Sequence, residues 1–263
     1  MIHGILIIGI NRFDSGVRML KSAKNADVRM HVIWRGFSAL PKLSKDIKPY
    51  FEMNLLECSI SQGRNILISH LLNDKSTKGQ DIVCFADDDG YWNSQLPSKV
   101  NFVFSEDIPW TLGIYGPSEQ EMFKRFPKKP RSFLSFKDLV EFGSSLGIYV
   151  RVEQIRKTGF FDESLGLGTK ISIGEDLDYL IRLKSTSKSS NYRPQLFQIH
   201  NYGSELSNNR INDSLEFYLY LKSKGTTFSI LYFRRILGLL VRGNIALSEG
   251  LQYCKKWTTI TPN

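Results

Sequence analysis

The sequence predicts an α/β fold in which a mostly parallel central sheet is flanked by helices and followed by a C-terminal helical extension. Short apolar runs at Ile5–Ile8, His31–Trp34 and Ile82–Phe85 have the length and composition of buried parallel strands. Between the first two runs, apolar residues recur at helical spacing, and parallel strands need such a crossover helix. The last part of the chain, 206–263, is dominated by helical patterns.

The first half of the chain alternates strand and helix. The strand Ile5–Ile8 ends in a loop at Gly9–Arg12, and residues 38–49 form a second loop after His31–Trp34. Two helices are expected, one with an apolar face at Phe13, Val17 and Leu20, and one that opens at Gly63-Arg64-Asn65 with a face at Ile68, Leu71 and Leu72.

The second half is less regular. Prolines and basic residues in the segment 109–137 predict a loop, which is either a mobile loop over a site or a solvated excursion. A strand is expected at Ile148–Val152, and another at Gln195–Ile199 that ends at His200. The expected helices carry apolar faces at Leu177, Leu180 and Ile181, and at Ile230, Phe233, Leu237, Leu240 and Val241.

Composition limits the class of protein. With 263 residues, 41% hydrophobic and 23% charged, the chain can bury the core of one large α/β domain with an appendage. No apolar run approaches the ~20 residues of a transmembrane helix, and the N-terminus lacks the features of a signal peptide. The cysteines Cys58, Cys84 and Cys254 lie far apart without metal-ligand spacing, which predicts unpaired thiols in the cytoplasm.

The net charge of +9 is compatible with nucleic acid, anionic lipid or acidic substrates as partners. The basic residues are scattered, and the aromatic–basic signature of an RNA-binding module is absent. We therefore expect no nucleic-acid partner, and an RNA-binding protein is the weakest of the alternatives.

Three consecutive carboxylates, Asp87–Asp89, follow the strand Ile82–Phe85. Ligands of open α/β sheets bind beyond the carboxyl ends of the strands. Carboxylates packed this closely repel one another and raise each other's pKa, so a bound cation would keep them ionised. Oxygen ligands suit Mg²⁺ or Mn²⁺, which commonly share their coordination with phosphate. The run predicts a metal–diphosphate site, and a solvated acidic turn explains it equally well.

A second acidic pair, Glu175-Asp176, opens a predicted helix. Acidic residues are favoured there by the helix dipole, which explains the pair without any chemistry. The alternative is that one carboxylate acts as a general base whose pKa the helix N-terminus lowers. Together, the two acidic sites suit sugar transfer from a nucleoside diphosphate, where a metal neutralises the leaving group and a base activates the acceptor hydroxyl.

Four motifs in this order resemble those of family 2 glycosyltransferases of the GT-A fold. They are Gly63-Arg64-Asn65, Phe85-Ala86-Asp87-Asp88-Asp89, Gly159-Phe160-Phe161-Asp162-Glu163 and Gly174-Glu175-Asp176-Leu177-Asp178, with His200 following a strand. The resemblance spans Ile5 to about His200 and implies a Rossmann-like GT-A domain. It is strongest to bacterial enzymes of surface-polysaccharide synthesis, which make capsule, O-antigen or exopolysaccharide.

The resemblance implies roles for the residues of the first acidic run. Asp87 matches the acid that approaches the ribose of the donor. Asp89 matches the last acid of the Asp-X-Asp motif, which holds the metal and diphosphate, and Asp88 lies between them and assists. His200 is either a further metal or diphosphate ligand or a strand-end histidine without a ligand role.

The resemblance also assigns residues outside that run. Asp176 matches the general base of an inverting reaction, with Glu175 beside it near the acceptor or sugar. Asn11 and Arg12 match the end of the first nucleotide-binding loop. Arg64 matches a turn near the nucleotide, although a solvated arginine at a helix start fits it equally.

Two departures from the family pattern favour a second hypothesis. The first loop, Gly9–Arg12, keeps only the end of the usual motif, and the strand His31–Trp34 is not followed by an acid. Trp34 is either a core residue or a base-stacking side chain. A non-catalytic nucleotide- or glycan-binding protein on the same fold is therefore the alternative. Phosphoryl transfer to water is a further one, although the Walker-type loop of P-loop NTPases is absent.

We expect a catalytic domain over 1–205, with a nucleotide-sugar half at 1–105 and an acceptor half at 106–205, and a helical extension over 206–263. The predicted enzyme uses a divalent cation and transfers a sugar from a nucleotide-sugar to a glycan or lipid-linked glycan. The basic, apolar C-terminal helix packs either on the domain or on the inner face of the cytoplasmic membrane, and is too short to span it.

Overall fold

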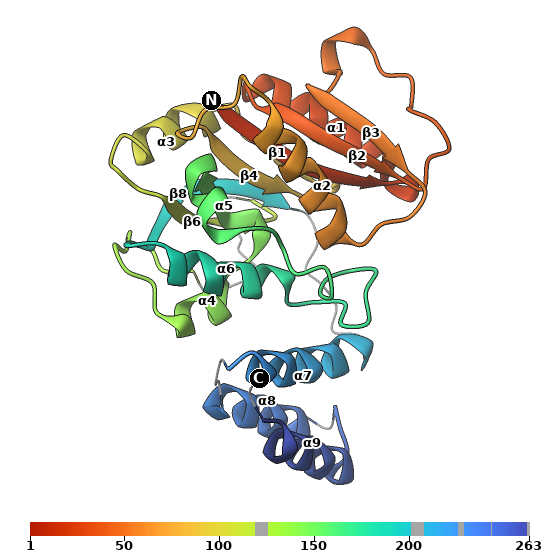
Figure 1. Ribbon diagram of the computed structural model, residues 1–263, viewed down its shortest axis with the longest axis vertical. Coiled ribbons are helices and arrows are strands. Elements are labelled where there is room, and N and C mark those ends of the chain that lie inside the picture. Colours follow the sequence, from red (N-terminus) through yellow and green to blue (C-terminus); the bar gives the residue numbers. More distant parts are fainter. Residues whose placement is uncertain (119–125, 201–207, 226–228, 243, 262–263) are drawn as a thin grey trace. The chain divides into compact units, whose positions relative to one another are not determined.

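The computed structural model describes residues 1–118, 126–200, 208–225, 229–242 and 244–261 (Figure 1). The chain divides into two compact units. The sheet unit comprises Met1–Glu163 and Glu175–Gly203, and the helical unit comprises Ser164–Gly174 and Ser204–Asn263. A short segment in the middle of the sequence thus groups with the C-terminal residues.

Eight strands in the described part of the chain form one sheet, in the order β3-β2-β1-β4-β7-β6-β8-β5. All strands except β5 and β7 run in the same direction, so the prediction of a mostly parallel sheet is confirmed. The strands are β1 (Ile2–Gly9), β2 (Arg29–Arg35), β3 (Phe51–Leu55), β4 (Ile82–Ala86), β5 (Gly90–Trp92), β6 (Trp110–Gly116), β7 (Ile148–Arg151) and β8 (Asn191–His200).

Helices cover both faces of this sheet (Figure 1). In the sheet unit they are α1 (Phe13–Asn25), α2 (Ile60–Asn73), α3 (Leu96–Val103), α4 (Phe136–Phe142), α5 (Val152–Thr158) and α6 (Glu175–Thr186), with short 3-10 turns η1 (Ile10–Arg12), η2 (Lys45–Ile47) and η3 (Ser145–Gly147). The helical unit contains α7 (Asn208–Ser223), α8 (Ser229–Val241) and α9 (Leu247–Thr259).

Strand β1 shows how the two faces are packed. Its side chains alternate, so Ile8 meets α1 on one face and Ile7 meets α2 on the other. Each helix comes close through a glycine, because a Cβ at Gly16 or at Gly63 would lie 2.6 Å from an isoleucine carbon atom. Burying each of these large apolar side chains stabilises the fold by about 1.5–3 kcal/mol.

Helix α2 begins earlier than the sequence predicts. The prediction places its start at Gly63, whereas the helix runs from Ile60 and is capped by Ser59, whose hydroxyl accepts a hydrogen bond from Gln62 N–H at 3.1 Å. Serine at the position before the first helical residue is a common capping choice. As a result, Arg64 lies inside the helix rather than in a turn.

The prediction of a loop over 109–137 is wrong for Trp110–Gly116, which is the buried strand β6. The glycines in this segment and a nearby proline favoured the prediction of a loop. Gly113 has a different role, because a Cβ there would collide with the backbone carbonyl of Leu196 on β8. The neighbouring residues 119–125 lie outside the described residues, and the proposed role of the segment over a site stays a prediction.

The helical unit has its own small core. Leu215 and Leu219 of α7 pack with Tyr232 and Ile236 of α8, and the Tyr232 ring stacks on Trp257 of α9 at 4.4 Å between centroids. Among the described residues, no helix combines the length and the apolar character required to cross a membrane.

The segment Ser164–Gly174 is held within the helical unit by α7. Ser172 donates a hydrogen bond from its hydroxyl to the Asp213 carboxylate. Gly174 has a φ of +96° and lies against the ring of Phe217, where any side chain would clash. This segment ends at the residue before α6.

Candidate active site

Strand register brings His200 to the acidic run. The run Asp87–Asp89 follows β4, and the chain then turns into β5. Because β5 pairs antiparallel with β8, Gly90 lies opposite His200, the last residue of β8. The carboxyl end of β4 and the end of β8 therefore meet at one edge of the sheet, where ligands of α/β sheets commonly bind.

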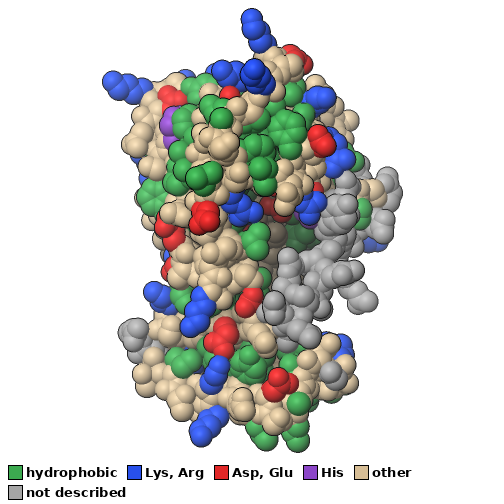
Figure 2. Space-filling view, turned by 90° about the vertical axis from the view of Figure 1, so that its right-hand side faces the viewer, with side chains coloured by type: hydrophobic (Ala, Val, Ile, Leu, Met, Phe, Trp, Pro, Cys, Tyr) green, Lys and Arg blue, Asp and Glu red, His purple; other side chains and the backbone are tan. Residues whose placement is uncertain are grey.

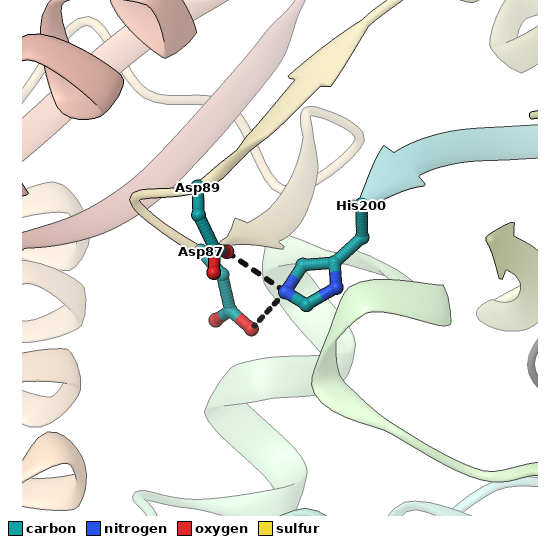
Figure 3. A group of neighbouring side chains, drawn as sticks. All are labelled: Asp87, Asp89 and His200. Atoms are coloured by element: carbon teal, nitrogen blue, oxygen red, sulfur yellow. Dashed lines mark ion pairs between the residues drawn. The ribbon is translucent and has the colours of Figure 1, made fainter. Parts of the chain in front are cut away.

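Three side chains converge at this edge (Figure 3). His200 Nε2 lies 2.8 Å from Asp89 Oδ1 and 3.6 Å from Asp87 Oδ2. One nitrogen or oxygen atom from each of the three residues lies within 4.8 Å of the others, and no other such triad occurs within the described ranges. Two carboxylates and one imidazole fit Mn²⁺ or Mg²⁺, with room for further oxygen ligands.

Asp88 does not belong to this cluster. Its carboxylate oxygen Oδ2 instead accepts a hydrogen bond from Gly9 N–H at 3.0 Å. The positive charges of Arg12 and Arg35 both act to lower the pKa of Asp88. Asn11 lies on η1 with its side chain exposed.

Arg64 connects the two acidic motifs. It is buried, and its Nη1 lies 3.0 Å from Asp176 Oδ1 and 3.4 Å from Glu175 Oε1. Its Nη2 donates to Ser145 Oγ at 2.9 Å and lies 3.9 Å from Asp87 Oδ1. The alternative of a solvated arginine at a helix start is therefore wrong, because the guanidinium lies between the two carboxylate groups.

The three consecutive aspartates have pKa values shifted in different directions. Partial burial raises the pKa of Asp87 to about 6, although Arg64 and His200 oppose the shift. Burial also raises the pKa of Asp88. For Asp89, burial acts in the same sense, but the hydrogen bond and charge of His200 outweigh it and hold its pKa below the usual value. The prediction that mutual repulsion raises these pKa values is thus wrong for Asp89, and burial is the larger cause for the other two.

Glu175 lies beside the buried Arg64, with 3.4 Å between Arg64 Nη1 and Glu175 Oε1. Burial raises the pKa of Glu175 to about 8, Asp176 adds to the shift and Arg64 opposes it. The prediction that the helix N-terminus lowers the pKa is wrong for Glu175, which keeps its proton at neutral pH. Burial alone would lower the pKa of Arg64, but the neighbouring carboxylates raise it above its usual value.

Two serines of the site were missed in the sequence. Ser145 accepts the Arg64 hydrogen bond, and Ser144 donates from its hydroxyl to Asp176 Oδ2 at 3.4 Å. The phenol of Tyr115 on β6 also interacts with Ser144, and burial raises its pKa. No spacing or motif marks these residues, because they reach the site through η3 and β6, which the sequence patterns did not reveal.

The motif Gly159–Glu163 supports the site rather than lining it. Asn65 holds this segment by donating to Phe161 O and Glu163 Oε1, both at 2.9 Å, and by accepting from Phe161 N–H at 2.8 Å. The Phe161 ring stacks on Tyr179 of α6 at 4.1 Å between centroids. These contacts connect α2, which carries Arg64, to α6, which begins with the second acidic pair.

The end of β2 departs from the family pattern as the sequence indicates. Trp34 is fully buried and donates from its indole nitrogen to Glu52 Oε2 at 2.9 Å, so the core interpretation is confirmed and base stacking is wrong. Arg35 follows it at the strand end. A Cβ placed on Gly9 would lie 3.8 Å from both Arg35 and Asp88, so Arg35 lies beside the first loop.

No protein-family model matches the sequence, and no curated protein matches it. The structure of GalNAc-T7 with UDP, GalNAc and Mn²⁺ is similar, with a TM-score of 0.52 and 12% identity over 88% of this chain. So is the mannosyltransferase PcManGT from Pyrobaculum calidifontis in complex with GDP-Man and Mn²⁺, with a TM-score of 0.53 and 11% identity over 85% of this chain. The chain has the GT-A fold. It spans 53% and 63% of those two chains, and at such low identity the likeness shows the fold alone.

Proposed function

We propose that this GT-A protein is a metal-dependent, inverting glycosyltransferase of family 2. It would move a sugar from a nucleotide-sugar to a hydroxyl group of a glycan acceptor. The observation that supports this best is the Asp87–Asp89–His200 cluster at the sheet edge, with Arg64 joining it to Glu175 and Asp176. Sugar transfer from a nucleoside diphosphate requires a cation that neutralises the leaving group and a carboxylate that acts as general base, and this site offers residues for both.

In this proposal Asp89 and His200 hold the metal, and Asp87 lies near enough to share it. The bound Mn²⁺ or Mg²⁺ would neutralise the charge that develops on the departing diphosphate. Asn11 and Arg12, which follow β1, and Asp88, which accepts a hydrogen bond from Gly9 N–H at the end of β1, would contact the nucleotide.

Asp176 is the proposed general base. Its side chain keeps a quarter of its surface accessible, and Arg64 and Ser144 fix its two oxygens. Glu175 cannot take the same role, because its raised pKa of about 8 keeps it protonated near neutral pH. A protonated Glu175 would instead donate a hydrogen bond to a hydroxyl of the acceptor or the transferred sugar.

The known structures suggest where to begin with substrates. One of the similar proteins is bound to UDP and the other to GDP-Man, so UDP- and GDP-sugars are the first donors to test. We propose a glycan or lipid-linked glycan of bacterial polysaccharide synthesis as the acceptor, met at the inner face of the cytoplasmic membrane. Residues 1–205 would form the donor and acceptor halves, and 206–263 the helical extension.

Thermal stability in the presence of donors tests this proposal. The purified chain is heated with UDP-, GDP-, CMP- and dTDP-sugars, each with and without Mn²⁺. At about 100 times its Kd a donor adds about 2.7 kcal/mol to the free energy of unfolding. We expect a Mn²⁺-dependent shift for one nucleotide class in the wild type and in Asp107→Ala, an exposed control, and no shift in Asp89→Ala. No shift with any donor would overturn the proposal.

A non-catalytic binding protein is the second candidate, and the end of β2 favours it. Arg35 and a buried Trp34 stand where the family pattern has an acid. A donor-dependent thermal shift without sugar transfer or donor hydrolysis, over a broad panel of glycan acceptors, would support this candidate over the enzyme.

A further inference from the structure

Helix α8 is apolar on two opposite faces. Tyr232, Ile236 and Leu239 point into the core of the helical unit. The stripe that the sequence marks includes Phe233, Leu237 and Val241, which remain 40%, 61% and 79% exposed. Large apolar side chains that remain exposed in a row on one helix mark an interaction surface, so we expect the outer stripe of α8 to have a partner.

Helix α9 extends this outer stripe. It runs antiparallel beside α8, since Phe233 contacts Trp257 at one end and a Cβ on Gly250 would lie 3.2 Å from Leu240 at the other. Two large apolar residues of α9, Leu247 and Leu251, are also 67% and 62% exposed.

All five exposed side chains lie on the side turned away from α7. On α8 the α7 side is marked by Arg235, which donates to Ser214, and on α9 by Lys256, which pairs with Glu216. At 100° per residue, Leu237 and Leu251 lie roughly opposite those marked positions. We call the five residues the apolar face: Phe233, Leu237, Val241, Leu247 and Leu251.

Basic residues border this face. Residues 229–261 contain five basic side chains and one acidic one, a net charge of +4. Arg234 and Lys255 are exposed and adjoin the face in the helical spacing. The single acid, Glu249, is engaged locally, since its carboxylate accepts a hydrogen bond from Ala246 N–H at 2.7 Å. Figure 2 shows hydrophobic, basic and acidic side chains on the surface of the C-terminal helices.

We propose that the apolar face is a docking surface for an anionic lipid bilayer. Apolar side chains on one helix face with cations at its border are the pattern of helices that lie in the membrane interface. A second copy of this chain fits less well. A symmetric dimer pairs a surface with itself, which would place the basic borders of both copies, including Arg234 and Lys255, in one interface.

This inference deepens the membrane contact named under the proposed function, but its test requires neither donor nor activity. The full chain is sedimented with vesicles of phosphatidylcholine alone, or with about one third phosphatidylglycerol, at about 0.1 M and about 0.5 M salt. We expect binding to the anionic vesicles at low salt, at least about tenfold weaker binding without the anionic lipid, and loss of binding at high salt.

Matched variants locate the surface. Leu237→Glu should weaken vesicle binding by about tenfold or more, because a charge replaces an inserted side chain. Phe102→Glu, at a 73% exposed position of α3, should leave it unchanged. Arg234→Gln should weaken binding by about fivefold, the equivalent of about 1 kcal/mol, whereas Lys21→Gln on α1 should not. All four positions are exposed, so thermal unfolding of each variant should match the wild type.

Three outcomes would overturn the proposal. One is that the wild type does not bind anionic vesicles. Another is that Leu237→Glu and Phe102→Glu bind equally well. The third is that sedimentation velocity finds a dimer that Leu237→Glu dissociates, which would assign the apolar face to a second copy of the chain.

Discussion

A histidine–carboxylate pair lies at each end of the parallel strands of the sheet unit, and the two pairs have different surroundings. At the carboxyl end, His200 and Asp89 are 2.8 Å apart, and Asp87 adds a third converging atom. At the amino end, His3 and Asp81 are 3.6 Å apart. We refer to these as the open end and the closed end.

At the closed end the histidine rings lie close to one another. His3 Nδ1 lies 3.0 Å from His31 Nε2, and the His31 ring lies 5.9 Å from that of His70. Asp81 accepts a hydrogen bond from Lys78 N–H at 2.7 Å. His3 and His31 have no accessible surface, so this group of titratable residues is part of the core.

The difference shows that residue type alone does not mark a functional site. Three of the four histidines of the chain lie at the closed end. The fourth, His200, meets two carboxylates, and the Asp87 side chain beside it remains 36% accessible. Convergence of ligand atoms together with access from solvent distinguishes the open end, and the predictions below test that distinction.

The largest expected effect concerns the open end, where one variant should lose sugar transfer but keep metal-dependent donor binding. Asp176→Asn should lower sugar transfer by about 10²–10⁴-fold, because an amide cannot take the acceptor proton. The Mn²⁺-dependent thermal shift with donor should persist, since Asp176 lies outside the Asp87–Asp89–His200 cluster. Transfer rates and donor shifts measured on one preparation check both statements, and full transfer by the variant would remove Asp176 from its proposed role.

The next effect compares the two histidines directly. His200→Ala should weaken Mn²⁺ binding by about 10–100-fold, through loss of one ligand. His3→Ala should leave Mn²⁺ affinity unchanged and lower the free energy of unfolding, because it opens a gap in a buried cluster. Isothermal titration with Mn²⁺ and thermal unfolding of both variants provide the comparison. Equal Mn²⁺ affinities would show that His200 is not a ligand.

The closed end should lose stability in acid. Burial, together with His3 and His70, lowers the pKa of His31 from 6.5 to about 3 in the folded protein. The unfolded chain therefore takes up a proton that the folded chain excludes, so this contribution is present above pH 6.5 and is lost as the pH falls toward 3. At about pH 5.5 the loss is about 1.4 kcal/mol.

A variant isolates this contribution from other titrating groups. The stability of the wild type relative to His31→Gln should fall by about 1.4 kcal/mol between about pH 7.5 and about pH 5.5. Glu175→Gln at the open end should give the opposite sign, because the pKa of Glu175 is raised and the folded protein holds the proton. Urea unfolding at both pH values measures these differences. If the stability of the wild type changed with pH in the same direction relative to both variants, the proposed difference between the two ends would be contradicted.

The smallest effect concerns α2, which carries Arg64 to the open end and His70 to the closed end. Ser59→Ala removes the cap of this helix and should lower the free energy of unfolding by about 1 kcal/mol. The melting temperature would fall by about 2–4 °C, while Mn²⁺ affinity stays the same. A changed Mn²⁺ affinity would show that the position of Arg64 depends on the cap.

Much of the open end could be predicted from local sequence. A buried strand followed by Asp87–Asp89, and a helix that starts at Glu175, are local patterns, and both are present. The pairing of Arg64 with Asp176 joins positions 112 residues apart, and no local pattern encodes it. Arg64 looked like a surface residue because its counterions are distant in sequence.

Strand β6 and the two serines were missed for a related reason. Gly113 is required by the close approach of β8, and that requirement exists only once the sheet has formed. The outer stripe of α8 was detected, but spacing could not tell it from the inner one, since both are apolar.

The segment Ser164–Gly174 has a consequence for how such proteins evolve. It belongs to the helical unit through Ser172 with Asp213 and Gly174 with Phe217, yet its last residue precedes Glu175 in the chain. The C-terminal helices are therefore not an interchangeable module. A recombination event that replaced them would also have to replace this internal segment, which lies between two parts of the sheet unit in the sequence, so we expect the two segments to be inherited together.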